Sequence, residues 1–212
     1  KCMKKRVVNI LLFFVVCSLL WGIRYVSFNQ RISEACYADY VTFGMNETVE
    51  YGKNLMNLNE NDGYSVKLRS AKLYEFNAFM NDYGIEKIPE SIEVTGVPEM
   101  ICLLTMEIKN TSNALDSVSL GDLSVIYGRD IVLQANEFIL DINPELNLLE
   151  EYSVHPEIGQ SQLVYIPFSL FKKDFSQKDW GALADYPFCF EVTQFPQKQV
   201  INIACEYAQL TN

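Results

Sequence analysis

Apolar and polar residues alternate along several segments of this chain, which is the period typical of half-buried β-strands. Residues 65–74, SVKLRSAKLY, alternate in this way, and so do residues 162–168, where Pro167 favours a sheet edge or a strand end. The denser run EMICLLTMEIK at 99–109 predicts a central strand covered on both faces, and turn residues at 110–113 end it. Shorter strands are predicted at 123–127, 131–134 and 137–140.

The clearest strand pair is predicted near the C-terminal end, where residues 188–195 and 199–206 flank a short turn. If the hairpin is centred on Gln197, Cys189 falls opposite Cys205, because each lies eight residues from 197. Facing cysteines at a non-hydrogen-bonded site are close enough for a disulfide, which an extracytoplasmic compartment permits. The alternatives are two buried free thiols, or a register that differs by one residue.

One segment has helical spacing instead. Residues 74–83 place apolar side chains at positions i, i+3, i+4 and i+7, and Gly84 then ends the helix; these side chains are Phe76, Phe79, Met80 and Tyr83. A second short helical turn is predicted at 179–183. About seven strands with one or two short helices indicate an all-β protein, an antiparallel β-sandwich of immunoglobulin-like type. The Cys–Trp–Cys pattern of antibody domains is absent from the sequence.

A continuous apolar run precedes these strands. Residues 7–26, VVNILLFFVVCSLLWGIRYV, are long enough to cross the hydrocarbon core of a bilayer, which takes about 20 helical residues. The cations Lys4, Lys5 and Arg6 stand directly before the run and favour a cytoplasmic N-terminus. We therefore expect a basic cytoplasmic tail at 1–6, a transmembrane signal anchor at 7–28, a linker at 29–39 and an extracytoplasmic β-sandwich domain at 40–212.

A cleaved signal peptide and a lipid anchor are the alternatives to an uncleaved anchor. The apolar run exceeds the 7–15 residues of a signal peptide, and bulky residues stand where small ones are needed for cleavage. A lipoprotein needs a small residue before its modified cysteine, whereas Val16 precedes Cys17. The sequence therefore favours a single-pass protein of the cell membrane.

The charge of the chain is strongly asymmetric. All 27 acidic residues lie at or beyond Glu34, whereas five of the 17 basic residues lie within the first 28. The part beyond residue 28 consequently carries twelve basic and 27 acidic residues, a net charge of −15. Such a surface repels phosphate backbones, which excludes nucleic acid as a partner.

Residues that would indicate a chemical reaction are sparse. His155 is the only histidine, no cysteines have the spacing of a zinc site, and neither a G-x-S-x-G elbow nor a glycine-rich phosphate loop occurs. Residues 57–63 faintly resemble a calcium loop, but the glycine comes one residue late and the carboxylate expected at the end of the loop is missing. The acidic residues at 150–151 and the pair Asp174 and Asp179 are expected on any acidic surface. We therefore predict no catalytic residue, no metal site and no cofactor.

Several segments together resemble a family of uncharacterised membrane-anchored or secreted proteins from Gram-positive bacteria, a domain of unknown function with an immunoglobulin-like β-sandwich. The matching segments are MKKRVVNILLFFVV, VTFGMNETVEYG, DGYSVKLRSAKLYEF, MEIKNTSN, QLVYIPFSL and YPFCFEV with FPQKQVINI. The resemblance spans most of the chain and rests on structural motifs. It implies the fold, export and a non-enzymatic role at the cell envelope, and it transfers no catalytic residue.

The leading hypothesis for function is a non-catalytic binding or interaction module, held outside the membrane by its single span, with a protein or peptide partner. An alternative is a protective, immunity-type envelope protein that is accessory to a transporter. An extracytoplasmic hydrolase using surface carboxylates is the third hypothesis, and the sequence favours it least because no reaction centre is visible.

Overall fold

The computed structural model describes residues 16–26, 39–52, 61–127, 131–144, 152–194 and 197–209. The chain divides into two compact units, residues 1–39 and residues 40–212. In the first unit residues 16–26 form a helix, and no described helix is both long and apolar enough to span a bilayer. Residues 7–15 and 27–28 of the predicted anchor, and residues 29–38 of the predicted linker, lie outside the described residues.

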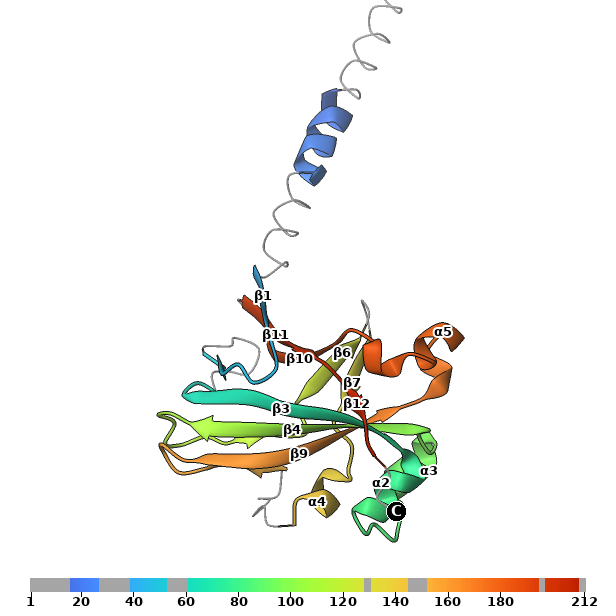
Figure 1. Cartoon of the computed structure of the whole chain (residues 1–212). Coiled ribbons are helices and arrows are strands. Elements are labelled where there is room, and N and C mark those ends of the chain that lie inside the picture. The colour runs from blue at the N-terminus through green and yellow to red at the C-terminus, as the bar shows by residue number, and fades with distance from the viewer. Residues whose placement is uncertain are drawn as a thin grey trace, which may run out of the picture. The chain divides into compact units, whose positions relative to one another are not determined.

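The second unit is mostly β-structure, as the alternation of apolar and polar residues predicts (Figure 1). Sheet A has five strands in the order β1 (Asp39–Phe43), β11 (Gln197–Ile203), β10 (Phe188–Thr193), β6 (Ser124–Tyr127) and β7 (Ile131–Gln134). Sheet B has the order β12 (Glu206–Tyr207), β3 (Tyr64–Glu75), β4 (Met100–Asn110) and β9 (Ser161–Leu170), and β2 (Val49–Glu50) also pairs with β3. A separate two-stranded sheet joins β5 (Val118–Ser119) and β8 (Ser153–Val154).

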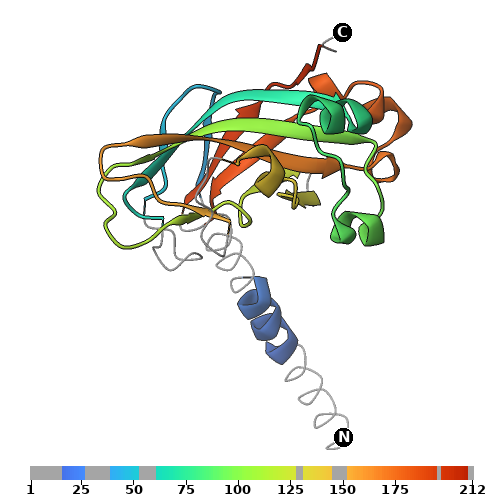
Figure 2. The same ribbon diagram turned by 90° about the horizontal axis from the view of Figure 1, so that it is seen from below.

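Short helices connect the strands. They are α2 (Phe76–Asp82), α3 (Glu90–Thr95), α4 (Ile139–Ile142) and α5 (Gln177–Trp180), with 3-10 turns η2 (Lys172–Asp174) and η3 (Leu183–Asp185). Figure 2 shows α2, α3 and α4 in a view from below, turned by 90° from that of Figure 1. Each is two turns or less, so tertiary packing rather than helix propensity must hold it in place.

The main hydrophobic cluster contains side chains from both sheets. Alternate residues of β4, such as Cys102 and Leu104, meet alternate residues of β10, such as Phe188 and Phe190, in this cluster. The period of two along each strand explains why these residues share a face. Sheet A and sheet B therefore share one hydrophobic core.

A second, smaller cluster covers one end of the outer face of sheet B. It joins Ile101 and Leu103 of β4 to Phe79 of α2 and to Phe138, which lies directly before α4. The Phe79 and Phe138 ring centroids are 5.5 Å apart in an edge-to-face arrangement. Because of this second cluster, β4 is buried on both faces where it begins, as its dense apolar run predicts.

The long predicted strands are confirmed. Residues 65–74 lie within β3, residues 99–109 correspond to β4, and residues 162–168 lie within β9. Pro167 stands on β9, the outermost strand of sheet B beside β4, so its missing N–H is tolerated there. The helix predicted at 74–83 is confirmed as α2.

The strand predicted at 137–140 is wrong. A turn and then α4 occupy this stretch, and the Asn136 side chain accepts a hydrogen bond from the Phe138 N–H at 3.1 Å. Phe138 and Ile142, four residues apart, then bury their side chains together in the second cluster. Helical spacing therefore outweighs the apolar run in this short segment.

The predicted register of the last hairpin is also wrong, and with it the facing of Cys189 and Cys205. Cys189 pairs with Asn202, three residues short of Cys205. The Thr193 hydroxyl donates to the Gln197 carbonyl at 2.7 Å, so the turn closes earlier in the chain than one centred on residue 197, and the register shifts again between Glu191 and Thr193. Cys205 lies beyond the end of β11, and both cysteines are free thiols.

Candidate functional site

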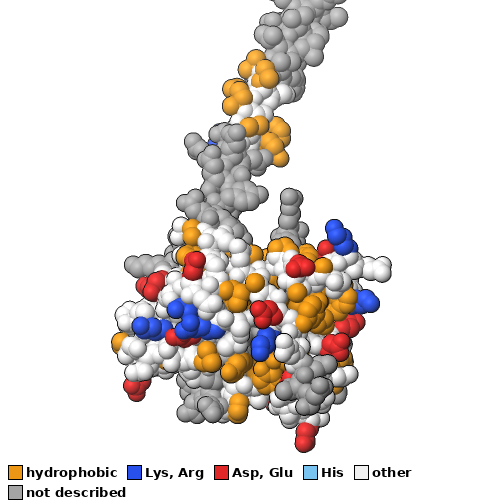
Figure 3. All heavy atoms as spheres, in the orientation of Figure 1, with side chains coloured by type: hydrophobic (Ala, Val, Ile, Leu, Met, Phe, Trp, Pro, Cys, Tyr) orange, Lys and Arg blue, Asp and Glu red, His pale blue; other side chains and the backbone are white. Residues whose placement is uncertain are grey.

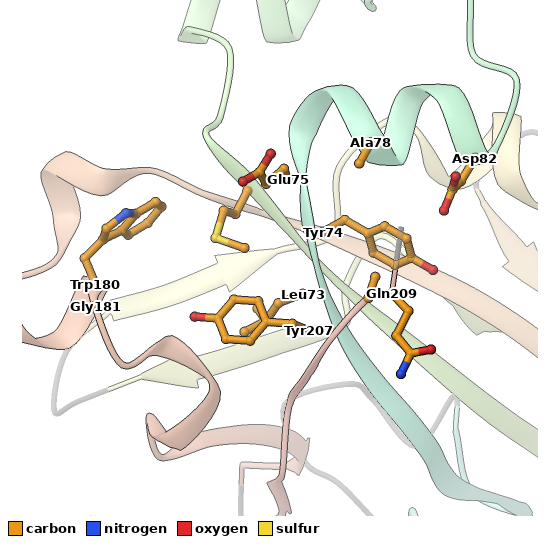
Figure 4. Close-up of a pocket in the computed structure, with 11 residues that line it drawn as sticks. Leu73, Tyr74, Glu75, Ala78, Asp82, Trp180, Gly181, Tyr207 and Gln209 are labelled. Atoms are coloured by element: carbon orange, nitrogen blue, oxygen red, sulfur yellow. The ribbon is translucent and has the colours of Figure 1, made fainter. Parts of the chain in front are cut away.

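A groove lies at the end of sheet B where β3 passes into α2. It consists of two adjoining cavities of about 330 and 490 Å³ that share Glu75, Met100 and Trp180 in their walls. Figure 4 shows the first cavity, which is lined by residues from β3, α2, β4 and α5 and from residues 207–209, the tail that contains the end of β12. A concave site with several segments in its walls is typical of a ligand-binding groove.

The strand ends fix the floor of this groove. Glu75, the last residue of β3, pairs with Met100, the first residue of β4. The Phe76 N–H donates to the Glu99 carbonyl at 3.1 Å, and this bond ties the start of α2 to β4. Phe76 itself is buried in the second cluster, which directs the Glu75 side chain to the exposed side.

Trp180 forms the wall opposite α2. It ends α5, whose N-cap Ser176 accepts a hydrogen bond from the Asp179 N–H at 3.2 Å. Its ring lies 5.6 Å from that of Phe175, which in turn stacks on Tyr127 at 4.4 Å. The indole is therefore held by the cap of α5 and by an aromatic cluster that extends into the main core.

The third wall is formed by residues 206–209, called here the β12 tail because they begin with β12. Tyr207 pairs in parallel with Leu73 of β3, and the Ala208 N–H donates to the Leu73 carbonyl at 2.9 Å. The Tyr207 side chain remains 53% exposed beside the cavity. The tail thus completes the groove through only a few backbone hydrogen bonds.

Acidic side chains dominate the charge of the groove. Glu75, Asp82 and Glu99 line the two cavities and are exposed, against the single cation Lys172. One Glu99 carboxylate oxygen accepts a hydrogen bond from the Lys172 backbone N–H at 2.9 Å. Figure 3 shows acidic and hydrophobic side chains next to each other on the face that carries β12 and α5.

This combination suits a cation. The faces of aromatic rings and nearby carboxylates both attract positive charge, and Met100 adds a polarisable apolar floor. No serine, cysteine or histidine occurs among the described residues that line the two cavities. The groove therefore offers aromatic rings and carboxylates as recognition groups.

His155 does not line this groove and instead belongs to a hydrogen-bond cluster with Tyr64 and Asp116. The Tyr64 hydroxyl donates to the Asp116 carbonyl at 2.6 Å, and His155 Nδ1 lies 2.5 Å from the same oxygen. Nδ1 must carry the proton to make that contact, so we assign the tautomer accordingly. Burial, and then the charge of Asp116, raise the pKa of Tyr64 to about 12. The cluster ties the loop around Asp116 to the start of β3.

The other acidic residues weighed from the sequence are not brought together as a catalytic pair. Asp179 accepts a hydrogen bond from the Ser176 hydroxyl at 2.7 Å within the cap of α5. The Asp174 carbonyl accepts a hydrogen bond from the Tyr127 hydroxyl. Residues 57–60 and 150–151 lie outside the described residues, and the described part of the chain holds no group of three potential metal ligands.

Sequence reasoning missed the groove. Trp180 and Tyr207 come from segments whose spacing has no periodic signal, and Glu75 reads simply as the polar end of a strand. The one available signal was Trp180 itself, a large apolar residue in a short turn that follows several polar residues. Large aromatic residues that remain partly accessible are enriched in binding sites.

Comparison with protein families gives one clear result. Residues 40–199 match the family described as a domain of unknown function, DUF5028, and the chain belongs to that family. The match includes β1 to most of the last hairpin and therefore covers most of the second unit. No curated protein and no solved structure gives a significant match.

Proposed function

We propose that this member of the DUF5028 family is a non-catalytic binding module of the cell envelope, and that its groove accepts a lysine or arginine side chain of a partner protein segment. In this proposal residues 40–212 form an immunoglobulin-like β-sandwich held outside the cell membrane by a single N-terminal span. The observation that carries the proposal is the groove, in which Trp180, Tyr207 and Glu75 converge from three segments (Figure 4).

The sandwich is supported by the way the two sheets are built. Both five-stranded sheets are almost wholly antiparallel, and their inward faces contribute to one hydrophobic cluster. The chain passes between sheets after β11, where residues 204–205 lead into β12. Exchange of consecutive strands between two sheets is typical of immunoglobulin-like folds.

The membrane anchor is supported by the sequence alone. The apolar run at 7–26 has the length of a bilayer span, and the cations at 4–6 precede it. A domain exported by such an anchor is placed where it meets partners at the cell surface or envelope. Its net charge of −15 beyond residue 28 then steers it toward basic partners.

A protein segment fits the groove better than a compact ligand. The two cavities adjoin along Glu75, Met100 and Trp180, so the site is elongated rather than a single closed chamber. An extended chain could place one long basic side chain between Trp180 and Tyr207 and run on past Glu99. The aliphatic stem of lysine or arginine would then contact Met100 while its charged end meets the carboxylates.

The experiment is a titration of the purified full chain with a fluorescently labelled peptide that carries two adjacent lysines, followed by anisotropy. The control peptide has norleucine in place of both lysines. We expect the lysine peptide to bind more tightly and its affinity to fall as salt is added, because exposed charges are screened. Equal binding of both peptides would overturn the proposal.

Matched variants of the protein locate the binding. Glu75→Gln and Trp180→Ala should each weaken binding by roughly threefold to tenfold, within the range of a cation–π contact or a partly exposed charge pair. Glu157→Gln removes the same charge from an exposed loop that does not line the groove and should leave binding unchanged. If Glu75→Gln and Glu157→Gln behave alike, the cation binds through the general charge of the domain and not through the groove.

A further inference from the structure

Two buried thiols from opposite parts of the chain lie side by side in the core. The sulfurs of Cys102 and Cys205 are 3.9 Å apart, although the residues are 103 positions apart in the sequence. Cys102 faces the main core from the middle of sheet B, and Cys205 lies between the end of β11 and the start of β12. Both belong to the main hydrophobic cluster, at 0% and 7% exposure.

We propose that Cys102 and Cys205 are an oxidation site, and that they form a disulfide when the domain meets a disulfide oxidant. The bond would join the centre of sheet B to the point where the chain leaves sheet A. It would hold the β12 tail, and with it the wall of the groove that contains Tyr207, against β3. This inference does not depend on what the groove binds.

The geometry favours this pair over the others that the structure describes. A disulfide needs its sulfurs at about 2.05 Å, so rotation of the two side chains must close less than 2 Å. Cys189 lies between Phe188 and Phe190, which face the core, so its own side chain points to the opposite face of sheet A. Its thiol instead contacts the Asn202 side-chain oxygen at 3.4 Å.

The local environment distinguishes the roles of the two thiols. A hydrogen bond from Cys102 lowers the pKa of the Cys205 thiol, while that same contact and then burial raise the pKa of Cys102. Cys205 is also the more accessible of the two, and it lies next to the short β12. It is therefore the thiol that would react first with an external oxidant.

The reaction needs a disulfide such as oxidised glutathione, or the disulfide form of a thiol oxidoreductase. The Cys205 thiolate attacks one sulfur of that disulfide, which breaks the oxidant's S–S bond, forms a mixed disulfide and releases one thiolate. The Cys102 thiolate then attacks the Cys205 sulfur and displaces the second. Two protein thiols lose two electrons and two protons in total, and the oxidant is reduced to two thiols.

The test treats the full chain with oxidised glutathione, and a second sample with a reductant. Remaining thiols are alkylated under denaturing conditions, and a non-reduced digest is analysed by mass spectrometry. We expect the peptide containing Cys102 to be joined to the one containing Cys205, and the joined peptide to be absent from the reduced sample. A product joining Cys189 to Cys205, or complete alkylation of Cys102 and Cys205 after oxidation, would overturn the proposal.

Variants and hydrogen exchange complete the experiment. Cys189→Ser should form the same joined peptide as the wild type, and Cys205→Ser should form none. In the oxidised wild type the Ala208 amide, which bonds to the Leu73 carbonyl, should exchange more slowly than in the reduced protein. Unchanged exchange would refute the role assigned to the bond in holding the tail. Failure of the lysine peptide to bind would refute the proposed function and leave this result standing.

Discussion

Tyr64 and Tyr51 are neighbours that differ in one respect, which makes them a matched pair for testing the hydrogen-bond cluster around His155. Both side chains are buried, and the Tyr51 N–H donates to the Tyr64 carbonyl at 3.0 Å. The Tyr64 hydroxyl donates to the Asp116 carbonyl, whereas the buried Tyr51 hydroxyl has no hydrogen-bond partner among the described residues. Replacing each by phenylalanine removes the same oxygen atom.

The expected magnitudes follow from what each hydroxyl leaves behind. Tyr64→Phe removes the hydroxyl that donates to the Asp116 carbonyl and also lies 2.7 Å from His155 Nδ1. Because His155 still satisfies the Asp116 carbonyl, the free energy of unfolding should fall by about 1 kcal/mol. Tyr51→Phe removes a buried hydroxyl that is desolvated without compensation, so stability should stay equal or rise by up to about 1 kcal/mol. For a domain of this size, each kcal/mol corresponds to roughly 2–4 °C in melting temperature.

The measurement is urea unfolding of the full chain and of the two variants, followed by circular dichroism. Alkaline pH provides a second readout. Because burial raises the pKa of Tyr64 from about 10 to about 12, its contribution to stability is complete below pH 10 and is lost as the pH rises toward 12. Tyr64→Phe should therefore lose less stability than the wild type over that interval. A Tyr51→Phe variant that is as damaged as Tyr64→Phe would refute this account of the cluster.

Three further tests, which use five substitutions, probe the packing and the surface by urea unfolding. Phe138→Ala empties the centre of the second cluster and should cost about 3–5 kcal/mol, whereas Leu115→Ala, at a side chain that is 91% exposed, should stay within about 0.5 kcal/mol. Gly63 has φ of 87°, and an added Cβ would meet the Asn113 nitrogen at 2.8 Å, so Gly63→Ala should cost more than Gly84→Ala, where φ is 64° and nothing lies within 4 Å. The hydrogen bond from Arg69 holds the pKa of Glu107 below its usual range, so the contribution of this pair to stability is present above pH ~4.3 and is lost as the pH falls further. Glu107→Gln should therefore cost less than about 1 kcal/mol at pH 7, as expected for an exposed pair, and nothing at pH 2; a cost that persists at pH 2 would contradict this.

The long strands were predictable because their signal is local. Alternation along β3 and the dense apolar run of β4 depend only on which faces are buried, and each extends over ten residues or more. The helix α2 was predictable for the same reason, since its apolar side chains recur at helical spacing before Gly84.

The predictions fail where contacts between distant segments, rather than local sequence, determine strand register and pairing. Alternation alone reveals neither the earlier turn that the Thr193 hydroxyl closes nor the irregularity between Glu191 and Thr193, and together these shift the partner of Cys189 by three residues. The strand β12 has two residues and pairs only because the chain returns to β3 after leaving sheet A. The groove was not predictable because Trp180 and Tyr207 approach Glu75 only through these long-range pairings.

Site-specific photo-crosslinking in intact cells that carry the full chain tests the proposed binding function most directly. A photoreactive amino acid is placed at Gln209, which lines the groove, or at Leu115, which is exposed and does not line it. We predict that position 209 crosslinks to a partner segment containing lysine or arginine at the crosslinked site, that position 115 does not, and that Glu75→Gln reduces the yield. Equal crosslinking from both positions, or captured segments without basic residues, would contradict the account.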